Sequence, residues 1–256
     1  MKHFSHFQIS LFLTVFIFRI TPCQVVPVQS GSFMMGSENG EQDEKPVHKV
    51  NLSSFSINKY EISNSQYDSC VRSGRCTPAH YEDGKCLLWT SGGFIKVSVP
   101  ENYRDPSAPV ACVSWYQADA YCRSKGMRLP TEAQWEYSAR AGGQSTYSWG
   151  NALPDLTKCN MFGSGKPSKS GSYNANGWGL FDMTGNVWEW TRDFYEKDYY
   201  TVSPLDNPDG PEAGLYKVIR GGGWYSTPEQ LRSTNRFWFS PDYAEASIGF
   251  RCAGGN

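Results

Sequence analysis

Apolar and polar residues alternate in short segments near the start of the chain, after an unbroken apolar run at residues 9–18. Residues 31–36 have the pattern of a strand. Between Val50 and Ile57, apolar side chains recur with a period close to two, which predicts a half-buried β-hairpin. Residues 38–44 lie between these segments and are mostly acidic and polar, so we expect them to form a solvated loop.

Three sites have the signature of a helix N-terminus, a hydroxyl residue followed three positions later by glutamine. In this capping box, each side chain bonds the backbone amide of the other residue and satisfies donors that the first helical turn leaves free. Gly74 and Gly126 favour helix ends, because glycine tolerates left-handed backbone. Beyond residue 142 we find no amphipathic helix. The three pairs are Ser63/Gln66, Ser114/Gln117 and Thr131/Gln134.

The composition indicates a globular domain with little regular structure. Of the 256 residues, 39% are hydrophobic and 15% aromatic, which argues against disorder. The mean hydropathy of −0.53 excludes a polytopic membrane protein. The 25 glycines and 15 prolines would interrupt long helices. We therefore predict a single α+β domain with much irregular structure.

The charges nearly cancel, with 24 basic and 25 acidic residues. Proteins that bind nucleic acids or anionic membranes usually carry a clear excess of basic residues. Neither class of partner is expected here.

Residues 1–23 have the layout of a secretory signal peptide. Lys2 precedes the apolar core at residues 9–18, which is too short to cross a bilayer, and a cleavage region follows near Cys23. A lipid anchor on Cys23 is the alternative, although Pro22 fits poorly where a small residue is expected. We predict a secreted or periplasmic domain of residues 24–256, without a membrane span.

Export favours disulfides over reactive thiols among the eight cysteines. Cys70 and Cys76 flank the end of the first predicted helix and are expected to form a local bridge. For Cys86, Cys112 and Cys159 the sequence does not determine a pairing. No Cys-x-x-Cys or His-x-x-x-His spacing occurs, so the sequence predicts neither a zinc site nor a histidine-bound iron site.

Four segments, taken in order, carry a resemblance to a known family. They are residues 113–122, residues 128–137 (RLPTEAQWEY), residues 179–190 (GLFDMTGNVWEW), and residues 220–224 (RGGGW) with 248–251 (IGFR). Together they resemble the formylglycine-generating enzyme, or sulfatase-modifying factor, family. The resemblance implies the fold of that family, a single irregular α+β domain that is distantly C-type-lectin-like.

The resemblance also implies where catalysis would occur. Enzymes of the family hold copper(I) with two cysteines after a Gly-Gly-Ser turn and use oxygen to convert a substrate cysteine into formylglycine. Paired thiolates are soft ligands that suit copper(I). In this chain Ser226 and Leu231 occupy the two cysteine positions, and Gly223 replaces the serine of the turn. We therefore expect no copper and no formylglycine generation by that mechanism.

A calcium site of the family maps onto residues 182–189. It implies ligands from the side chains of Asp182 and Glu189 and from the backbone carbonyls of Gly185 and Val187. Calcium binds six to eight oxygens, and a turn between two carboxylates can supply several of them. The alternative is that both carboxylates only accept hydrogen bonds from amides of the turn.

A structural pairing also follows from the resemblance: Cys122 and Cys252 match a family disulfide between an early helix and the C-terminal strand. We further expect Arg128 and Arg251 to be buried structural arginines that pair with carboxylates; the alternative is that they bind the substrate.

Trp188 matches a tryptophan that lines the peptide groove of the enzymes, and with Ser226 it is our candidate for ligand contact; packing in the core is the alternative for Trp188. We conclude that the sequence predicts an exported, calcium-binding member of the family that recognises a peptide or protein surface without generating formylglycine. The alternative is an oxidoreductase that modifies a secreted substrate, a sulfatase cysteine or a siderophore-type molecule, by a mechanism without copper thiolates.

Overall fold

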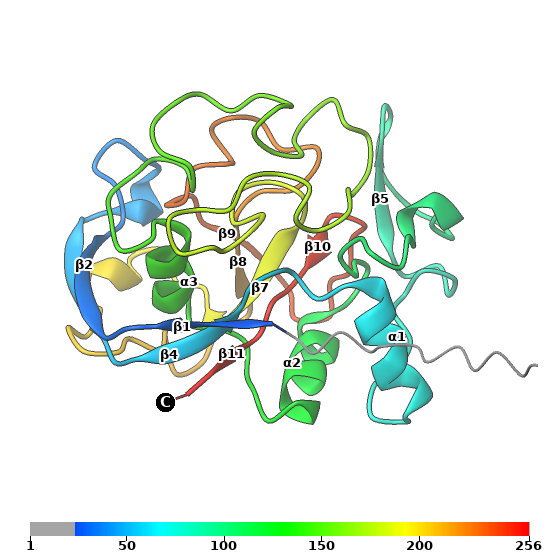
Figure 1. Cartoon of the computed structure of the whole chain (residues 1–256), viewed down its shortest axis with the longest axis horizontal. Coiled ribbons are helices and arrows are strands. Elements are labelled where there is room, and N and C mark those ends of the chain that lie inside the picture. The colour runs from blue at the N-terminus through cyan, green and yellow to red at the C-terminus, as the bar shows by residue number, and fades with distance from the viewer. Residues whose placement is uncertain (1–23, 256) are drawn as a thin grey trace, which may run out of the picture.

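The computed structural model describes residues 24–255, in which three α-helices and several small sheets are set among long irregular segments (Figure 1). The mixed α+β class and the low content of regular structure are as predicted. The signal peptide expected at residues 1–23, including the alternative lipid site at Cys23, lies outside the described residues.

The three helices begin where the capping boxes predict. At each N-terminus the hydroxyl accepts a hydrogen bond from the glutamine amide, and the glutamine side chain accepts one from the amide of the capping residue. These reciprocal bonds satisfy two backbone donors per helix. The helices are α1 (Asn64–Arg72), α2 (Trp115–Ser124) and α3 (Glu132–Ala139), preceded by Ser63, Ser114 and Thr131.

The largest sheet has the strand order β10-β7-β8-β9. Strand β10 is parallel to β7, and the other neighbours are antiparallel. Because β9 is the last strand in this order, its outer side has no partner strand within residues 24–255. The strands are β7 (Trp188–Phe194), β8 (Lys217–Arg220), β9 (Phe237–Phe239) and β10 (Ile248–Gly249).

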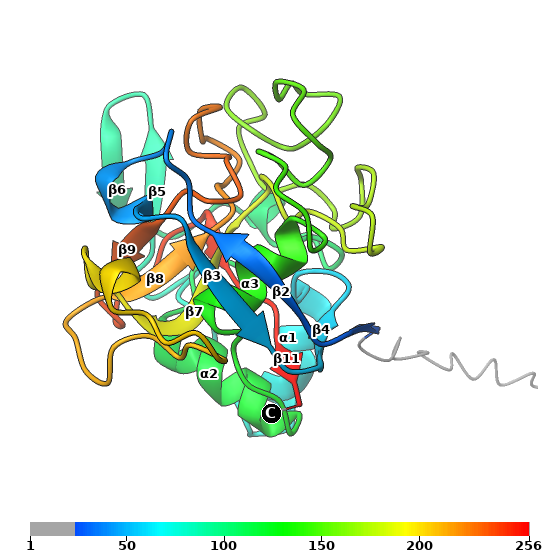
Figure 2. The same cartoon turned by 90° about the vertical axis from the view of Figure 1, so that its left-hand side faces the viewer.

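The predicted hairpin at residues 50–57 is wrong, although both of its strands are present. Strand β3 (His48–Leu52) pairs with β2 (Gly31–Met35), whereas β4 (Phe55–Asn58) lies between β1 (Val25–Val28) and β11 (Ala253–Gly254) (Figure 2). The two residues that connect β3 to β4 are serines, not the Asn-Gly type of pair that closes a tight hairpin turn. The chain therefore passes from one sheet to another.

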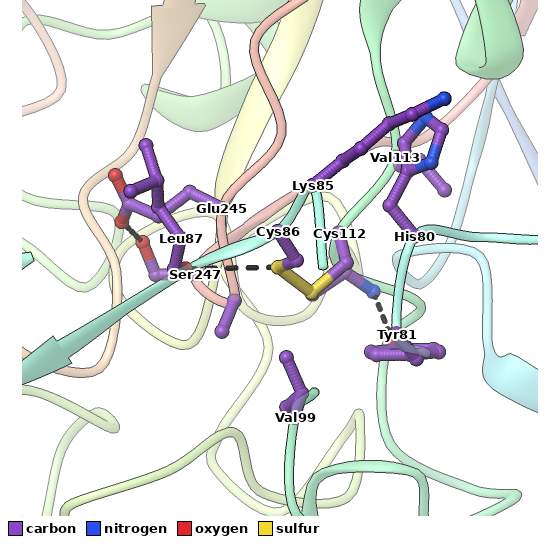
Figure 3. The surroundings of a disulfide bond; sticks show 12 residues. His80, Tyr81, Lys85, Cys86, Leu87, Val99, Cys112, Val113, Glu245 and Ser247 are labelled. Atoms are coloured by element: carbon purple, nitrogen blue, oxygen red, sulfur yellow. Dashed lines mark hydrogen bonds between the residues drawn. A yellow bond between two sulfur atoms is a disulfide. The ribbon is translucent and has the colours of Figure 1, made fainter. Parts of the chain in front are cut away.

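A separate hairpin, β5 (Leu87–Thr90) and β6 (Gly93–Lys96), projects from the body of the domain (Figure 1). The disulfide Cys86–Cys112 anchors its base, and Glu245 and Ser247 lie beside this bond (Figure 3). Leu87 exchanges backbone hydrogen bonds with Ala244 and Ala246, both at 2.9 Å. The hairpin is thus fixed covalently and by backbone pairing.

Two further disulfides are present, and both were expected: Cys70–Cys76 and Cys122–Cys252. Cys159 is free and buried. The sequence left the pairing of Cys86, Cys112 and Cys159 open, and the structure selects the first two.

The acidic segment at residues 38–44 is not a fully solvated loop. It contains a 3₁₀ turn, η1 (Gln42–Glu44), and both Asp43 and Glu44 are buried. The carboxylate of Glu44 accepts two hydrogen bonds of 2.6 Å from Arg232. This guanidinium lies 188 residues away in the sequence, so no local sequence pattern could predict that the charge of Glu44 is neutralised by an ion pair.

The core contains two large hydrophobic clusters, one around Trp190 and one around Trp135. Both tryptophans are fully buried, whereas Trp115 is only half-buried. Two further 3₁₀ turns, η2 (Glu101–Tyr103) and η3 (Tyr199–Thr201), lie in the irregular segments. Among residues 24–255, no helix is long and apolar enough to cross a membrane.

Candidate functional site

The glycine turn that follows β8 brings Ser226 and Leu231 together. Gly222 has a φ of 77°, and a Cβ added there would lie 2.6 Å from Leu231 Cδ2 and 3.3 Å from Ser226 Cβ. The backbone can therefore approach both side chains closely only because this residue is glycine. The two positions assigned to the copper cysteines by the resemblance are neighbours in space.

Neither of these two side chains can act as a soft metal ligand. Both residues are fully buried. The Ser226 hydroxyl accepts a hydrogen bond of 2.9 Å from the Gly223 amide. Leu231 packs in a small apolar cluster with Tyr147 and Cys159.

The thiol of Cys159 lies in that same cluster. Burial raises the pKa of this thiol to about 12, so it stays protonated at neutral pH. A protonated thiol is neither a good nucleophile nor a good metal ligand. We therefore interpret Cys159 as a packing residue.

The loop at residues 182–189 lies against the glycine turn. Gly185 donates to the Gly221 carbonyl at 2.9 Å, and Trp224 donates to the Asn186 carbonyl at 2.8 Å. Gly185 must be glycine, because its φ is 90° and an added Cβ would lie 2.5 Å from the Asn160 carbonyl oxygen. The candidate metal loop and the glycine turn therefore form one framework.

Glu189 is part of a buried ion pair. Its two carboxylate oxygens each accept a 2.7 Å hydrogen bond from Arg251, and Oε2 also accepts one of 2.9 Å from Trp135. The predicted pairing of Arg251 with a carboxylate is confirmed. Arg128 is half-buried and donates to the amide oxygen of Gln134.

Glu61 is a further acidic residue at this site, and the sequence analysis missed it. It is buried and accepts hydrogen bonds from the Val187 amide at 3.3 Å, the Asn186 side chain at 2.8 Å and the Ser170 hydroxyl at 2.9 Å. Burial, with the charges of Asp182 and Glu189, raises the pKa of Glu61 well above its usual range. The only local signal was an acidic residue just before a helix cap.

Asp182 is the third carboxylate of this group. It has a φ of 54°, and its Oδ2 accepts a 2.6 Å hydrogen bond from the Gly171 amide. Burial raises the pKa of Asp182 to about 6. Three buried carboxylates thus share one buried guanidinium, that of Arg251, which leaves excess negative charge when all are ionised.

This donor set is compatible with calcium, with one restriction. A divalent cation would neutralise the excess charge, and backbone carbonyls such as those expected from Gly185 and Val187 are oxygen ligands of the kind that calcium accepts. A carboxylate has about four lone-pair positions, and Glu189 already uses three, so it can offer at most one oxygen contact. Within residues 24–255, no group of three or more His, Cys, Asp or Glu side chains is spaced to hold a metal by itself.

Trp188 and Ser226, our candidates for ligand contact, are both buried. Trp188 is 2% exposed, and its ring lies 5.9 Å from that of Phe237. Phe237, in contrast, is 38% exposed. A ligand that approaches here meets Phe237 and the other residues of β9 before it meets Trp188.

A groove lies beside this edge strand. Its volume is about 680 Å³, which falls in the range of ligand-binding clefts. The rings of Tyr195 and Trp238 stack within it at a centroid distance of 3.8 Å. Asn235 is 7% exposed, and its Oδ1 has no hydrogen-bond partner within the described chain. We call this cleft the β9 groove; it is lined by Glu41, Gln42, Asp43, Tyr195, Lys197, Gln230, Asn235, Arg236, Phe237 and Trp238.

The irregular α+β fold and the paired glycine turn and acidic loop define the class of the protein, a domain of the formylglycine-generating enzyme type. The model of the sulfatase-modifying factor enzyme 1-like domain matches residues 19–255, and the chain belongs to this family.

Curated relatives include an active and an inactive form. The chain is 34% identical to the formylglycine-generating enzyme of Streptomyces coelicolor, over 89% of this chain and 88% of that protein. It is 30% identical to the inactive C-alpha-formylglycine-generating enzyme 2 of Mus musculus, over 90% and 85% of the two chains. It is also 36% identical to the serine/threonine-protein kinase pkn1 of Chlamydia caviae, but spans only 38% of that protein's length.

Solved structures support the fold. PvdO from Pseudomonas aeruginosa superposes with a TM-score of 0.76 at 27% identity, over 91% of this chain and 94% of that chain. Treponema denticola variable protein 1 gives a TM-score of 0.72 at 22% identity, over 90% and 94%. The expected fold class is confirmed.

Proposed function

We propose that this chain recognises an extended polypeptide and does not generate formylglycine. The observation that carries the proposal is the β9 groove, because it combines an unpaired strand edge, the exposed Phe237 beside half-buried aromatic rings, and a buried polar atom without a partner among the described residues. An edge strand can accept another strand through backbone hydrogen bonds, while neighbouring pockets select side chains.

The polar groups of the groove favour a ligand rich in N–H donors. The Oδ1 atom of Asn235 is buried without a donor, and an unmade buried hydrogen bond costs about 1 to 3 kcal/mol. The carboxylate of Asp43 accepts a hydrogen bond of 2.9 Å from the hydroxyl of Tyr195, and a carboxylate can accept about four such bonds. A peptide backbone supplies N–H groups at regular intervals, and an apolar side chain of the peptide would contact Phe237 and Trp238.

We propose that formylglycine is not generated because Ser226 and Leu231 stand at the two positions expected for the copper cysteines. Their side chains fill the space beside Gly222, and neither offers a thiolate. The relatives of this chain include a mammalian protein that is named inactive, so loss of the activity has a precedent among them.

We further propose that calcium occupies the loop at residues 182–189. Asp182 and the carbonyls of Gly185 and Val187 would hold the ion, with one oxygen contact from Glu189. The role of the ion would be structural, because it neutralises buried carboxylates and supplies no reacting group. Export to an oxidising compartment is proposed on the three disulfides.

Peptide recognition is tested by selecting random linear peptides displayed on phage against the purified protein. We expect enrichment of a short consensus with an apolar residue. Phe237→Arg should abolish binding of the selected peptide, because it places a charge on the groove wall. Leu215→Arg is the matched control, since Leu215 is 79% exposed outside the groove. No enrichment, or equal loss in both variants, would contradict the proposal.

Asn235→Leu separates ligand binding from stability. It removes the unpartnered acceptor while keeping a similar volume, so the free energy of unfolding should stay the same or rise. Binding of the selected peptide should weaken by roughly tenfold, which corresponds to one lost hydrogen bond of about 1.4 kcal/mol. Unchanged binding would show that Asn235 does not contact the peptide.

The missing oxidation chemistry is tested with a sulfatase-motif peptide, copper and oxygen. The wild type should leave the peptide cysteine unmodified by mass spectrometry. The double variant Ser226→Cys with Leu231→Cys should bind about one copper(I) per chain, because it restores a soft thiolate pair. The single variant Ser226→Cys is the control. Conversion of the cysteine by the wild type without bound copper would favour the alternative oxidoreductase.

A further inference from the structure

The ammonium group of Lys217, at the start of β8, is buried without a carboxylate partner. Lys217 is 5% exposed, and its Nζ donates to the Arg192 carbonyl at 2.8 Å. The Nζ atom lies 3.4 Å from the ring centroid of Phe194 and 4.1 Å from that of Trp115. None of the ion pairs within 4.0 Å in the described chain includes Lys217. The two ring faces attract the charged ammonium through cation–π contacts. Buried charges are normally also paired with an opposite charge, and no ion pair of the described residues does this for Lys217.

Lys217 lines a cavity of about 460 Å³ at the far end of β8 from the glycine turn. No residue that lines this cavity also lines the β9 groove. Three guanidiniums surround it: Arg123, Arg128 and Arg192. Arg123 pairs with Asp119 at 2.8 Å and Arg192 with Asp209 at 2.9 Å, which leaves further donors on each guanidinium.

Burial favours the neutral form of the amine, whereas most of the charges around it favour the ammonium. Burial lowers the pKa of Lys217 to about 8, and the positive charge of Arg192 acts in the same direction. Asp193, Asp119 and Asp209 oppose the shift. The other charged groups that line the cavity are Arg123 and Arg128, which disfavour a second cation, and Glu212, which favours one. A neutral lysine amine is a nucleophile, and desolvation is a common way to activate it.

We propose that Lys217 is a reactive amine whose cavity accepts a small oxo acid, an aldehyde or ketone that carries a carboxylate, and forms an imine with it. The amine nitrogen attacks the carbonyl carbon, and a C–N bond forms. The carbonyl oxygen leaves as water with the two protons of the amine, and a C=N bond results. No oxidant or reductant is required. The carboxylate of the oxo acid would be held by the donors of Arg123 and Arg192 that their aspartates leave free.

The test uses glyoxylate as the probe, on the intact wild-type protein at about neutral pH. Cyanoborohydride reduces any imine to a stable carboxymethyl amine, which peptide mapping by mass spectrometry locates. Lys217 should be labelled at least about tenfold faster than the exposed Lys197, because burial lowers the pKa of Lys217 and the guanidiniums that line its cavity attract the carboxylate of the probe. Equal or slower labelling of Lys217 would overturn the proposal.

Two controls test the role of the guanidiniums. Propionaldehyde has an aldehyde but no carboxylate, and it should label Lys217 several-fold more slowly than glyoxylate relative to Lys197. Arg192→Gln should remove most of that preference, while thermal melting shows whether the variant is folded. If both aldehydes label Lys217 at the same relative rate in the wild type, the cavity does not select oxo acids and the proposal fails.

Discussion

The glycine turn and the acidic loop are hydrogen-bonded to each other, yet their interiors differ in kind. Beside Gly222 the chain buries an isobutyl group and a hydroxyl, both neutral and both packed. The loop at residues 182–189 instead buries carboxylates around Arg251. A neutral, filled site stabilises the fold through packing. A charged site remains sensitive to cations, pH and the loss of a single partner.

The largest effect is expected from removing the only buried cation of the loop. Arg251→Met would leave Glu189 buried without its partner, and breaking a buried ion pair in this way costs about 3 to 5 kcal/mol. The melting temperature should fall by roughly 10 °C. Arg123→Met is the matched control, because that pair is mostly exposed and should contribute less than about 1 kcal/mol. Similar losses in both variants would contradict the comparison.

The neutral site should respond through packing alone. Leu231→Ala creates a cavity beside Gly222 and should cost about 2 to 5 kcal/mol, measured by urea unfolding. This loss should not depend on calcium. Leu215→Ala provides the exposed control and should change the free energy of unfolding by less than about 0.5 kcal/mol. A calcium-dependent loss in Leu231→Ala would show that the two regions are not energetically separate.

Calcium removal should affect the loop by an intermediate amount. At about a hundred times Kd the ion adds roughly 2.7 kcal/mol, so EGTA should lower the melting temperature by roughly 5 to 10 °C. Asp182→Asn should flatten this response, because it removes a charged ligand without changing shape. Glu189→Gln is a poorer test, since it also leaves Arg251 without its partner. Identical melting with calcium and with EGTA would refute the metal assignment.

The smallest effect, counted per pH unit, concerns Asp193, which is on the same strand as Glu189 but is hydrogen-bonded to a backbone amide. Burial, with the charge of Glu132, raises the pKa of Asp193 to about 8. Between the unfolded and folded pKa values the native state holds the extra proton, so the free energy of unfolding falls as pH rises. The slope from this group reaches at most about 1.4 kcal/mol per pH unit. Urea unfolding from about pH 5 to 7 should show a flatter profile for Asp193→Asn. Equal slopes would contradict this assignment.

Local signals in the sequence predicted the local features well. The three capping boxes located α1, α2 and α3 because the bonds that define a helix start lie within a few residues. Features that depend on distant partners were missed. The burial of Glu44 depends on Arg232, and the sheet position of β4 depends on β11 at the other end of the chain.

In the candidate site, too, the local features were predicted and the features that depend on distant residues were missed. The motif resemblance was enough to predict that Ser226 and Leu231 lie near each other, because both are on one short segment. Glu61 joins the acidic loop from 126 residues away, and no pattern around it distinguishes it from a surface residue. The β9 groove is lined by residues of η1 and β9, which are far apart in the sequence, so it could not be predicted from the sequence either.

The sheet order β1-β4-β11 also sets the sequence of events during folding. The amide of Cys252 bonds the side chain of Asn58, 194 residues earlier, and the disulfide between Cys122 and Cys252 spans 130 residues. Until residues 252–254 have been synthesised, β4 lacks one of its two neighbours and Cys122 lacks its disulfide partner. Such long-range contacts slow folding and leave intermediates with exposed strand edges. The first sheet can therefore be completed only after β11 has been synthesised, and variants that lack β11 should remain trapped before this step.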